Sequence, residues 1–245
     1  LTNVLLDPLK ATNDRRLFYY AKPSPVQITA GVPQSDKAAY PGVEPSDSFS
    51  SLQTRRVNKD YADVNLRYVQ LVNAEPVGVF NYWDLQFILA EATVRGWITG
   101  TPAQTYYAAG IASSMTFIAT YTPDVADYHH NMKMDASYIA AFPSTAGVAL
   151  AGTNEQQILQ IITQKYIASF LQGNKFQGWY ENRRTGYPVF KLNTSTNLNT
   201  PSTNFPLRWL YPSNELSYNG ANLADAVARQ YNGSDDQNQA MWLLK

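Results

Sequence analysis

The feature that most constrains the fold is a change near residue 79 from a proline-rich sequence to one with helical apolar periodicity. Seven of the fourteen prolines fall in residues 1–78, several of them in turn-forming clusters such as Lys22-Pro23-Ser24-Pro25 and Tyr40-Pro41-Gly42. Proline lacks a backbone N–H and clashes with the preceding helical turn, so this segment cannot hold long helices. We predict extended loops with short strands there, for example over residues 66–72, and helices from residue 79 onward.

Residues 79–118 have the periodicity of two helices. Apolar residues spaced by three or four lie on one face of a helix. Thr101-Pro102 supplies an N-cap and a first-turn proline for the second helix. With the short linker 97–100, the pattern predicts an antiparallel hairpin of the tetratricopeptide-like kind. The apolar faces comprise Phe80, Trp83, Phe87, Ala90 and Val94, then Tyr106, Tyr107, Ile111, Met115 and Ile118.

A second helix pair is predicted further along the chain. Thr153-Asn154-Glu155-Gln156 fits a capping box and opens a helix whose apolar side holds Ile158, Ile161, Ile162 and Tyr166. Gly173 is expected to break this helix, and Asn174 to start another that Gly186 and Pro188 stop. The flanking elements we expect are a short helix near residues 135–142, a polar loop over 191–206 and a last helix over 213–231.

These elements predict a mainly α fold with tetratricopeptide-like helix hairpins, long irregular loops and minor β structure. Residues 1–78 are the Pro-rich loop segment and residues 79–245 the helical region. We expect both to belong to one lobe.

The charge and composition exclude several classes of protein. Nineteen basic residues balance nineteen acidic ones, which removes the electrostatic footprint of a nucleic-acid binder or an anionic-membrane binder. With no cysteine, disulfides and thiolate chemistry are impossible. Seventeen Tyr and five Trp beside many amides and hydroxyls suit a surface that stacks on sugar rings, although such residues also simply cover and fill proteins.

No catalytic or metal constellation stands out in the sequence. Asp84 and Glu91 share a helix face, but we interpret Asp84 as a first-turn acid and Glu91 as an interhelical contact, and neither has an evident partner for glycoside hydrolysis. Adjacent His129 and His130 diverge on a helix or strand; only a loop, with Asp124 or Asp127 assisting, could bring them to one metal. We therefore expect no catalytic residue, no metal and no cofactor.

The segment from Glu181 to Pro188 has two readings. Its guanidinium groups, from Arg183 and Arg184, could bind an acidic sugar. The favoured interpretation is structural: Glu181 and Arg184 pair at i,i+3 while the arginines cap carbonyls at the helix end.

Three blocks stand in a fixed order over residues 82–242. They are Tyr82-Trp83-Asp84-Leu85-Gln86-Phe87-Ile88-Leu89-Ala90-Glu91-Ala92 with Arg95-Gly96-Trp97; Gln164-Lys165-Tyr166-Ile167-Ala168 with Trp179-Tyr180-Glu181 and Arg183-Arg184-Thr185-Gly186-Tyr187-Pro188; and Arg208-Trp209-Leu210-Tyr211-Pro212 with Met241-Trp242. Together they resemble the SusD/RagB-like family of outer-membrane nutrient-binding lipoproteins of Bacteroidetes. One block alone would be a weak match, whereas three in order are specific. Asp7-Pro8 and Asp14-Arg15-Arg16 look like a mid-chain segment of such proteins.

The resemblance implies an α superhelix and a role in nutrient import. It implies a carboxy-terminal part of a lipoprotein on the outer face of the outer membrane, whose lipid anchor lies outside this chain. Such a protein caps a SusC-like TonB-dependent transporter and delivers oligosaccharide, or in some relatives peptide, to it. We therefore predict non-catalytic binding; the alternatives are a helical glycoside hydrolase using Asp84 or Glu91, and a protein-interaction scaffold without a small ligand.

The predicted ligand contacts lie in the Pro-rich segment, because binding residues concentrate on long loops over a rigid base. A ring there can offer a stacking face while neighbouring amides and carboxylates reach hydroxyl groups. The alternative is that these rings pin the loops to the helices. The predicted contacts are Tyr40, Tyr61, Tyr68, Asn58 and Asp60.

Overall fold

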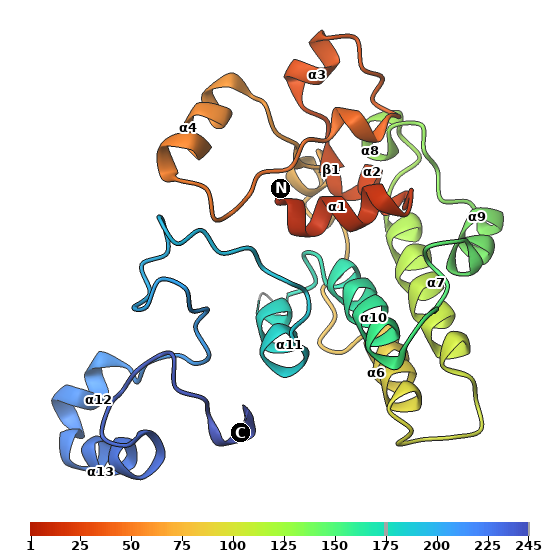
Figure 1. The fold of residues 1–245 in the computed structure, drawn as a ribbon. Helices are drawn as coiled ribbons and strands as arrows, with labels where there is room; N and C mark the ends of the chain where they lie inside the picture. The colour runs from red at the N-terminus through yellow and green to blue at the C-terminus, as the bar shows by residue number, and fades with distance from the viewer. Residues whose placement is uncertain (174–175, 245) are drawn as a thin grey trace.

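The computed structural model describes residues 1–173 and 176–244, and these residues are mainly helical (Figure 1). The mainly α fold predicted from the sequence is confirmed. Within the described residues, no helix is both long enough and apolar enough to span a membrane. The helices are α1 (Asn3–Ala11), α2 (Arg16–Tyr20), α3 (Pro25–Thr29), α4 (Phe49–Asn58), α5 (Arg67–Gln70), α6 (Tyr82–Val94), α7 (Ala103–Tyr121), α8 (Ala126–His129), α9 (Ala136–Ala141), α10 (Asn154–Ala168), α11 (Gln177–Thr185), α12 (Ser213–Tyr218) and α13 (Gly220–Tyr231).

The centre of the molecule is the predicted antiparallel hairpin of α6 and α7, with α10 packed beside α6. The start of α6 meets the end of α7, where the rings of Trp83 and Phe117 form an edge contact with centroids 5.0 Å apart. Phe87 lies against Gly110, where a Cβ atom would come within 2.8 Å of the ring. A residue without a side chain therefore sets how closely the two helices approach.

The helix boundaries match the sequence signals in part. The capping box at Thr153 is confirmed, since its Oγ1 accepts the Gln156 N–H and the Gln156 side chain accepts the Thr153 N–H. The α7 helix starts one position later than predicted, with Pro102 rather than Thr101 at the N-cap. The α10 helix ends at Ala168, before Gly173.

Two further boundaries differ from the sequence predictions or escape the test. Asn174, which was predicted to start the next helix, lies outside the described residues. That helix, α11, is described from Gln177. The single helix expected over 213–231 is two, α12 and α13, because the chain turns at Asn219.

Residues 1–78 hold short helices where loops and strands were expected. The strand predicted over 66–72 is wrong: Arg67–Gln70 form α5, because the Asn65 side chain accepts the Arg67 N–H and starts a helical turn. The two strands that do form are β1 (Ala21–Lys22) and β2 (Asp63–Val64), paired antiparallel with Ala21 opposite Val64. The division of the chain into two segments within one lobe stays a prediction.

A buried polar cluster joins the amino-terminal helices to the central ones. The Arg16 guanidinium, fully buried, pairs with Asp14 at 2.5 Å and also donates to the side-chain oxygen of Gln164 on α10. A charge without water needs such partners, and breaking a buried pair typically costs about 3–5 kcal/mol. The cluster therefore fixes how α2 sits on α10.

Candidate functional site

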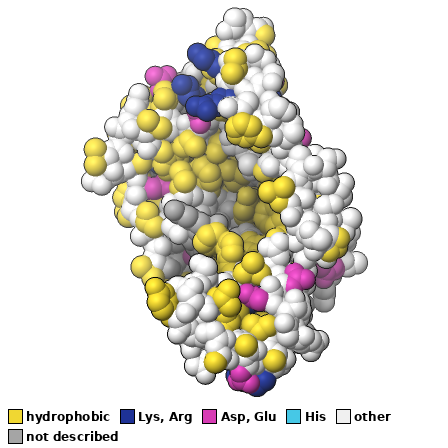
Figure 2. All heavy atoms as spheres, turned by 90° about the vertical axis from the view of Figure 1, so that its left-hand side faces the viewer, with side chains coloured by type: hydrophobic (Ala, Val, Ile, Leu, Met, Phe, Trp, Pro, Cys, Tyr) yellow, Lys and Arg dark blue, Asp and Glu magenta, His cyan; other side chains and the backbone are white. Residues whose placement is uncertain are grey.

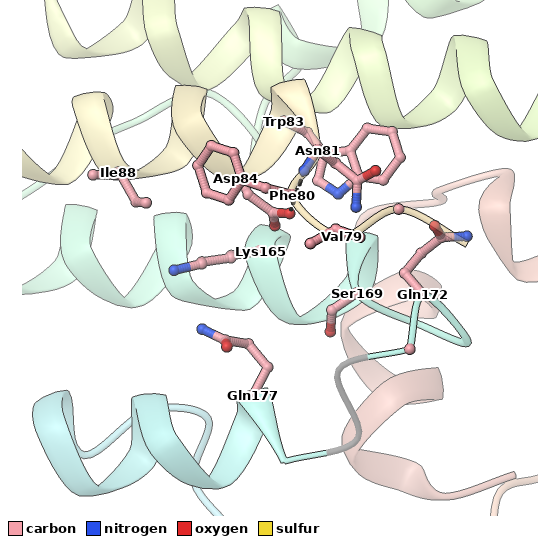
Figure 3. Close-up of a pocket in the computed structure, with 12 residues that line it drawn as sticks. Val79, Phe80, Asn81, Trp83, Asp84, Ile88, Lys165, Ser169, Gln172 and Gln177 are labelled. Carbon is pink, nitrogen blue, oxygen red and sulfur yellow. Dashed lines mark hydrogen bonds between the residues drawn. The ribbon is translucent and has the colours of Figure 1, made fainter. Parts of the chain in front are cut away.

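A pocket lies where four parts of the chain meet (Figure 3). It holds about 540 Å³ and is lined by the segment before α6, the first turns of α6, the end of α10 with the residues that follow it, and the start of α11. This volume is within the usual range for small-molecule sites, about 300–1,000 Å³. The lining mixes rings and aliphatic side chains with amide, hydroxyl and charged groups, among them Phe80, Trp83, Asp84, Lys165, Ser169 and Gln172.

Two side chains in the pocket wall carry buried polar atoms without partners. Among the described residues, the indole N–H of Trp83 and the amide oxygen of Gln172 have no hydrogen-bond partner, although both residues are more than nine-tenths buried. Leaving such a group unsatisfied typically costs about 1–3 kcal/mol. Both atoms are shielded from solvent, so a hydroxyl group, which donates and accepts, would satisfy them only after part of the wall has moved.

The positive charge at the pocket is already neutralised. Lys165 Nζ lies 2.6 Å from Glu181 Oε1, and Glu181 also accepts from Arg184 at 2.5 Å. Arg184 reaches across to Glu91 on α6, with Nη1 2.6 Å from Oε1. Among the described residues, the cation in the pocket wall, Lys165, is therefore already paired with a carboxylate.

The two carboxylates weighed as catalytic acids have structural roles. Asp84 Oδ2 accepts the Asn81 N–H at 3.1 Å, which closes the first turn of α6. Although burial acts to raise it, hydrogen bonds from Arg184 and Arg95 hold the pKa of Glu91 below its usual value. A general acid at neutral pH needs a raised pKa, so Glu91 does not have the environment of one. The interhelical role predicted for Glu91 and the Glu181–Arg184 pair are confirmed.

Arg183 does not cap the end of its own helix, α11. Arg183 donates to the Leu207 carbonyl oxygen at 2.8 Å, and its guanidinium lies over the Trp179 ring. The prediction that both arginines satisfy carbonyls at the end of α11 is therefore wrong, because tertiary partners are available.

Of the predicted ligand contacts, two have rings engaged inside the protein. Tyr40 is fully buried, and its hydroxyl donates to the Gln34 carbonyl at 2.6 Å. A ring without an exposed face cannot stack on a sugar, so the choice of Tyr40 is corrected: it pins its loop to the core. Tyr68 lies beneath the Arg67 guanidinium, 4.0 Å from the ring centroid, and its hydroxyl donates to Glu75.

The other three predicted contacts gather at the end of α4. Asn58 is exposed, Asp60 is half-buried near Arg55, and Tyr61 is half-buried. Within residues 1–173 and 176–244 the Tyr61 hydroxyl has no hydrogen-bond partner. None of the three lines the pocket of Figure 3.

The histidines separate as their adjacency predicts. His129 Nε2 lies 3.0 Å from Asp124, whereas the His130 ring faces the Ala21 carbonyl oxygen at 3.1 Å. In the described part of the chain, no three His, Asp or Glu side chains cluster as a metal ion would require.

The pocket was not predicted from the sequence. Trp83 was predicted in the core, which the burial of the residue supports, and Gln172 had no predicted role. The Tyr166 ring, expected in the core, is half-buried. No periodicity or motif signals Gln172, because it follows the last turn of α10 and comes to line the same pocket as Trp83 only through the fold.

A second groove, of about 610 Å³, lies between the amino-terminal region and the 190–205 loop. Figure 2 shows a hollowed face with many hydrophobic side chains along its walls. Phe49, Phe190 and Phe205 line this groove, and the last two rings stack with centroids 5.4 Å apart.

Comparison with known proteins gives one family and several solved structures. Residues 1–212 match a SusD-like family model described as starch-binding and associating with the outer membrane. A SusD homologue from Bacteroides fragilis is 42% identical over 100% of this chain, with a TM-score of 0.95. A second homologue from that organism is 35% identical over 99% of this chain, with a TM-score of 0.85.

A more distant structure extends the likeness. A chitin-binding SusD homologue from Flavobacterium johnsoniae is 25% identical over 100% of this chain, with a TM-score of 0.68. No curated protein is similar enough to count as a relative. The chain spans about half the length of these structures: 52%, 51% and 49% of their chains in the same order.

Proposed function

The chain belongs to the SusD-like family, and on that premise we propose that it binds a neutral glycan at the bacterial outer membrane without cleaving it. The pocket at the start of α6 is the proposed site. The single observation that carries the proposal, beyond the family, concerns the described residues of the pocket wall: the Trp83 indole N–H and the Gln172 amide oxygen have no partner, and Lys165 is paired with Glu181.

The names of similar proteins favour a carbohydrate ligand. The family model is described as starch-binding, and the Flavobacterium johnsoniae homologue as chitin-binding. Both polymers are neutral and rich in hydroxyl or amide groups, which fits the lining of this pocket. Delivery of the glycan to a SusC-like TonB-dependent transporter, from the extracellular face and with a lipid anchor, is part of the proposal.

Phe80 provides the direct test of the site. Its ring is exposed at the pocket (63%), so Phe80→Ala removes a stacking face with little effect on folding. By analogy with base stacking, worth roughly 1–3 kcal/mol, affinity should fall about 10-fold or more. Titration calorimetry with maltotriose and with N,N′,N″-triacetylchitotriose measures it.

The matched control for this test is Phe49→Ala. Phe49 is similarly exposed (77%) but lines the second groove. Equal losses in both variants, or a loss only in Phe49→Ala, would move the site away from α6. Binding of neither sugar by the parent protein would reject a starch-like or chitin-like ligand.

The absence of turnover is a separate part of the proposal. The parent protein and Glu91→Gln are incubated with starch and chitin oligosaccharides, and newly formed reducing ends are counted. We expect none from either protein. Sustained release by the parent that vanishes in Glu91→Gln would establish the hydrolase alternative.

The end of α4 is a second candidate contact, from Tyr61 with Asn58 and Asp60. Its support is the half-exposed Tyr61 ring, whose hydroxyl is free among the described residues. Tyr61→Ala should weaken sugar binding. Tyr68→Ala, made in the same background, should instead lower the free energy of unfolding, because Tyr68 contacts Arg67 and Glu75.

A further inference from the structure

Gly78, Val79 and Phe80 in the pocket wall are the end of a stretch of chain that has few hydrogen bonds to the rest of the protein. Residues 72–80 form neither helix nor strand. Among the described residues they make no backbone–backbone hydrogen bond outside their own segment or within it. Four of their apolar side chains are exposed: Val72, Val77, Val79 and Phe80. A segment with few buried contacts and unpaired backbone groups opens at low free-energy cost.

One side chain anchors this stretch by hydrogen bonds. Glu75, whose side chain is 4% exposed, pairs with Arg67 at 2.8 Å and accepts from the Gln172 amide nitrogen at 2.8 Å. Tyr68 adds a hydroxyl at 3.2 Å. Hydrogen bonds to an ionised acceptor are the stronger kind, so Glu75 is a latch on an otherwise loose segment.

The latch also orients the pocket wall. Because the Gln172 nitrogen is committed to Glu75, the amide oxygen is the atom left without a partner. Figure 3 shows the Gln172 side chain reaching from the end of α10 toward the stretch before α6, with Trp83 beyond that stretch. The Gln172 oxygen and the Trp83 indole nitrogen are both shielded from solvent, so a ligand reaches them only if part of the wall moves.

We propose that residues 72–80 are a lid, latched by Glu75 to Gln172 and Arg67, which opens so that hydroxyl groups of a neutral sugar bind the Trp83 indole N–H and the Gln172 amide oxygen. This inference rests on the proposed function for its ligand but not for its latch. Glu75 is then a positioning residue, and Trp83 and Gln172 are the residues that hydrogen-bond the hydroxyl groups.

The latch is tested without any ligand. Gln172→Met keeps the side-chain length, removes the contact to Glu75 and leaves the Arg67–Glu75 pair intact. Hydrogen exchange of the indole N–H groups is followed by NMR. We expect the Trp83 N–H to exchange about 10-fold faster than in the parent, the factor that corresponds to losing about 1.4 kcal/mol.

Trp179 is the internal reference for this measurement, since its indole N–H donates to the Pro206 carbonyl at 2.9 Å, away from the lid. An unchanged Trp83 rate, or equal acceleration of Trp83 and Trp179, would overturn the latch. Glu75→Gln should accelerate Trp83 further because it also weakens the Arg67 contact. If that variant does not fold, Gln172→Met still decides the question.

The hydroxyl contacts are tested by titrating maltotriose and N,N′,N″-triacetylchitotriose into the labelled parent protein. The proposal expects the Trp83 indole resonance to shift while that of Trp179 stays. Binding seen by calorimetry with no shift at Trp83 would overturn the hydroxyl contacts and leave glycan binding standing. If neither sugar binds, the proposed function fails, and the latch stands or falls on the exchange rates alone.

Discussion

The α6–α7 hairpin and the amino-terminal residues 1–78 secure their cores in different ways. The hairpin buries mainly apolar side chains, and its backbone groups are paired within long helices. Phe80, predicted on the buried face, is the exception: it lies before α6 and is exposed. The amino-terminal region has helices of ten residues or fewer and strands of two. Its interior contains two fully buried arginines, Arg16 and Arg67, and buried tyrosines that include Tyr20 and Tyr40.

The difference arises because short helices and strands leave many of their backbone N–H and carbonyl groups unpaired. A helix of one or two turns has most of its carbonyls and N–H groups unpaired, so side chains must satisfy them. Arg67 Nε donates to the Tyr19 carbonyl at 3.1 Å, and Asn65 donates to that of Phe18 at 2.9 Å. The amino-terminal region should therefore be sensitive to the loss of one polar group, and the hairpin to a change of volume.

The sharpest test of this contrast is Asp14→Ala. The change leaves Arg16 fully buried without its carboxylate, which should lower the free energy of unfolding by about 3–5 kcal/mol. Denaturant unfolding monitored by circular dichroism measures the loss. Asp225→Ala is the control, because that carboxylate pairs with Arg229 in solvent (67% exposed), and it should leave the unfolding midpoint near that of the parent. A loss of similar size in both variants would contradict the special role of the buried pair.

The sensitivity of the hairpin to side-chain volume is tested with Gly110→Ala. A Cβ atom there would lie 2.8 Å from the Phe87 ring, and overpacking of this kind costs about 1–3 kcal/mol. The better helix propensity of Ala offsets about 1 kcal/mol of it, so a net loss is expected in thermal melts. Phe87→Leu added to Gly110→Ala should restore part of it.

Gly220→Ala is the matched control for this prediction. Gly220 is also helical, and a Cβ atom there meets nothing within 4 Å. The same substitution should be neutral or stabilising at that position. Destabilisation at Gly220 as large as at Gly110 would show that close packing does not govern the hairpin.

The same contrast explains which elements the sequence could predict. Apolar periodicity and a local capping box suffice for α6, α7 and α10, because the signal lies within the helix itself. The short helix α5 depends on Asn65 and on a buried Arg67 that contacts the Tyr19 carbonyl and Glu75. Those partners are tertiary, so the β-branched and aromatic residues over 66–72 favoured a strand instead.

The candidate site was less predictable than the fold for the same reason. Tyr40 and Tyr68 lie in a Pro-rich segment, but their burial is decided by contacts with Phe18 and Phe170 from other elements. Gln172 becomes part of the pocket only when the end of α10 meets the stretch before α6. Residue type can indicate sugar chemistry, whereas the side chains left without partners depend on the complete fold.

The link between the hairpin and α11 gives a pH-dependent prediction. Because the pKa of Glu91 is lowered in the folded protein by Arg184 and Arg95 against the effect of burial, its ionised form is stabilising. This contribution is present above the unfolded-state pKa and is lost as pH falls through the folded-state value. Glu91→Gln should lower the melting temperature at pH 7 and reduce the further drop between pH 5 and pH 3.

The control for this pH prediction is Asp225→Asn, which removes an exposed i,i+4 partner of Arg229. Its melting curve should follow that of the parent at each pH, because exposed pairs contribute little. If the melting temperature of Glu91→Gln fell between pH 5 and pH 3 by as much as that of the parent, the Glu91–Arg184 contact would not be a source of the pH-dependent stability.

The smallest expected effects compare two helix caps, one in each region. Thr153 caps α10, whose apolar face is buried in the core, and Ser48 caps α4, which has no buried residue. Removing a cap typically costs about 1 kcal/mol, but only a helix that unfolds with the core transmits this loss to the global transition. Thr153→Ala should therefore lower the global unfolding free energy by about 1 kcal/mol, whereas Ser48→Ala should accelerate amide exchange in α4 and leave the global transition in place. Equal shifts of the global transition would mean that α4 unfolds together with the core, and the distinction between a helix held by its apolar face and one held by local contacts would fail at this position.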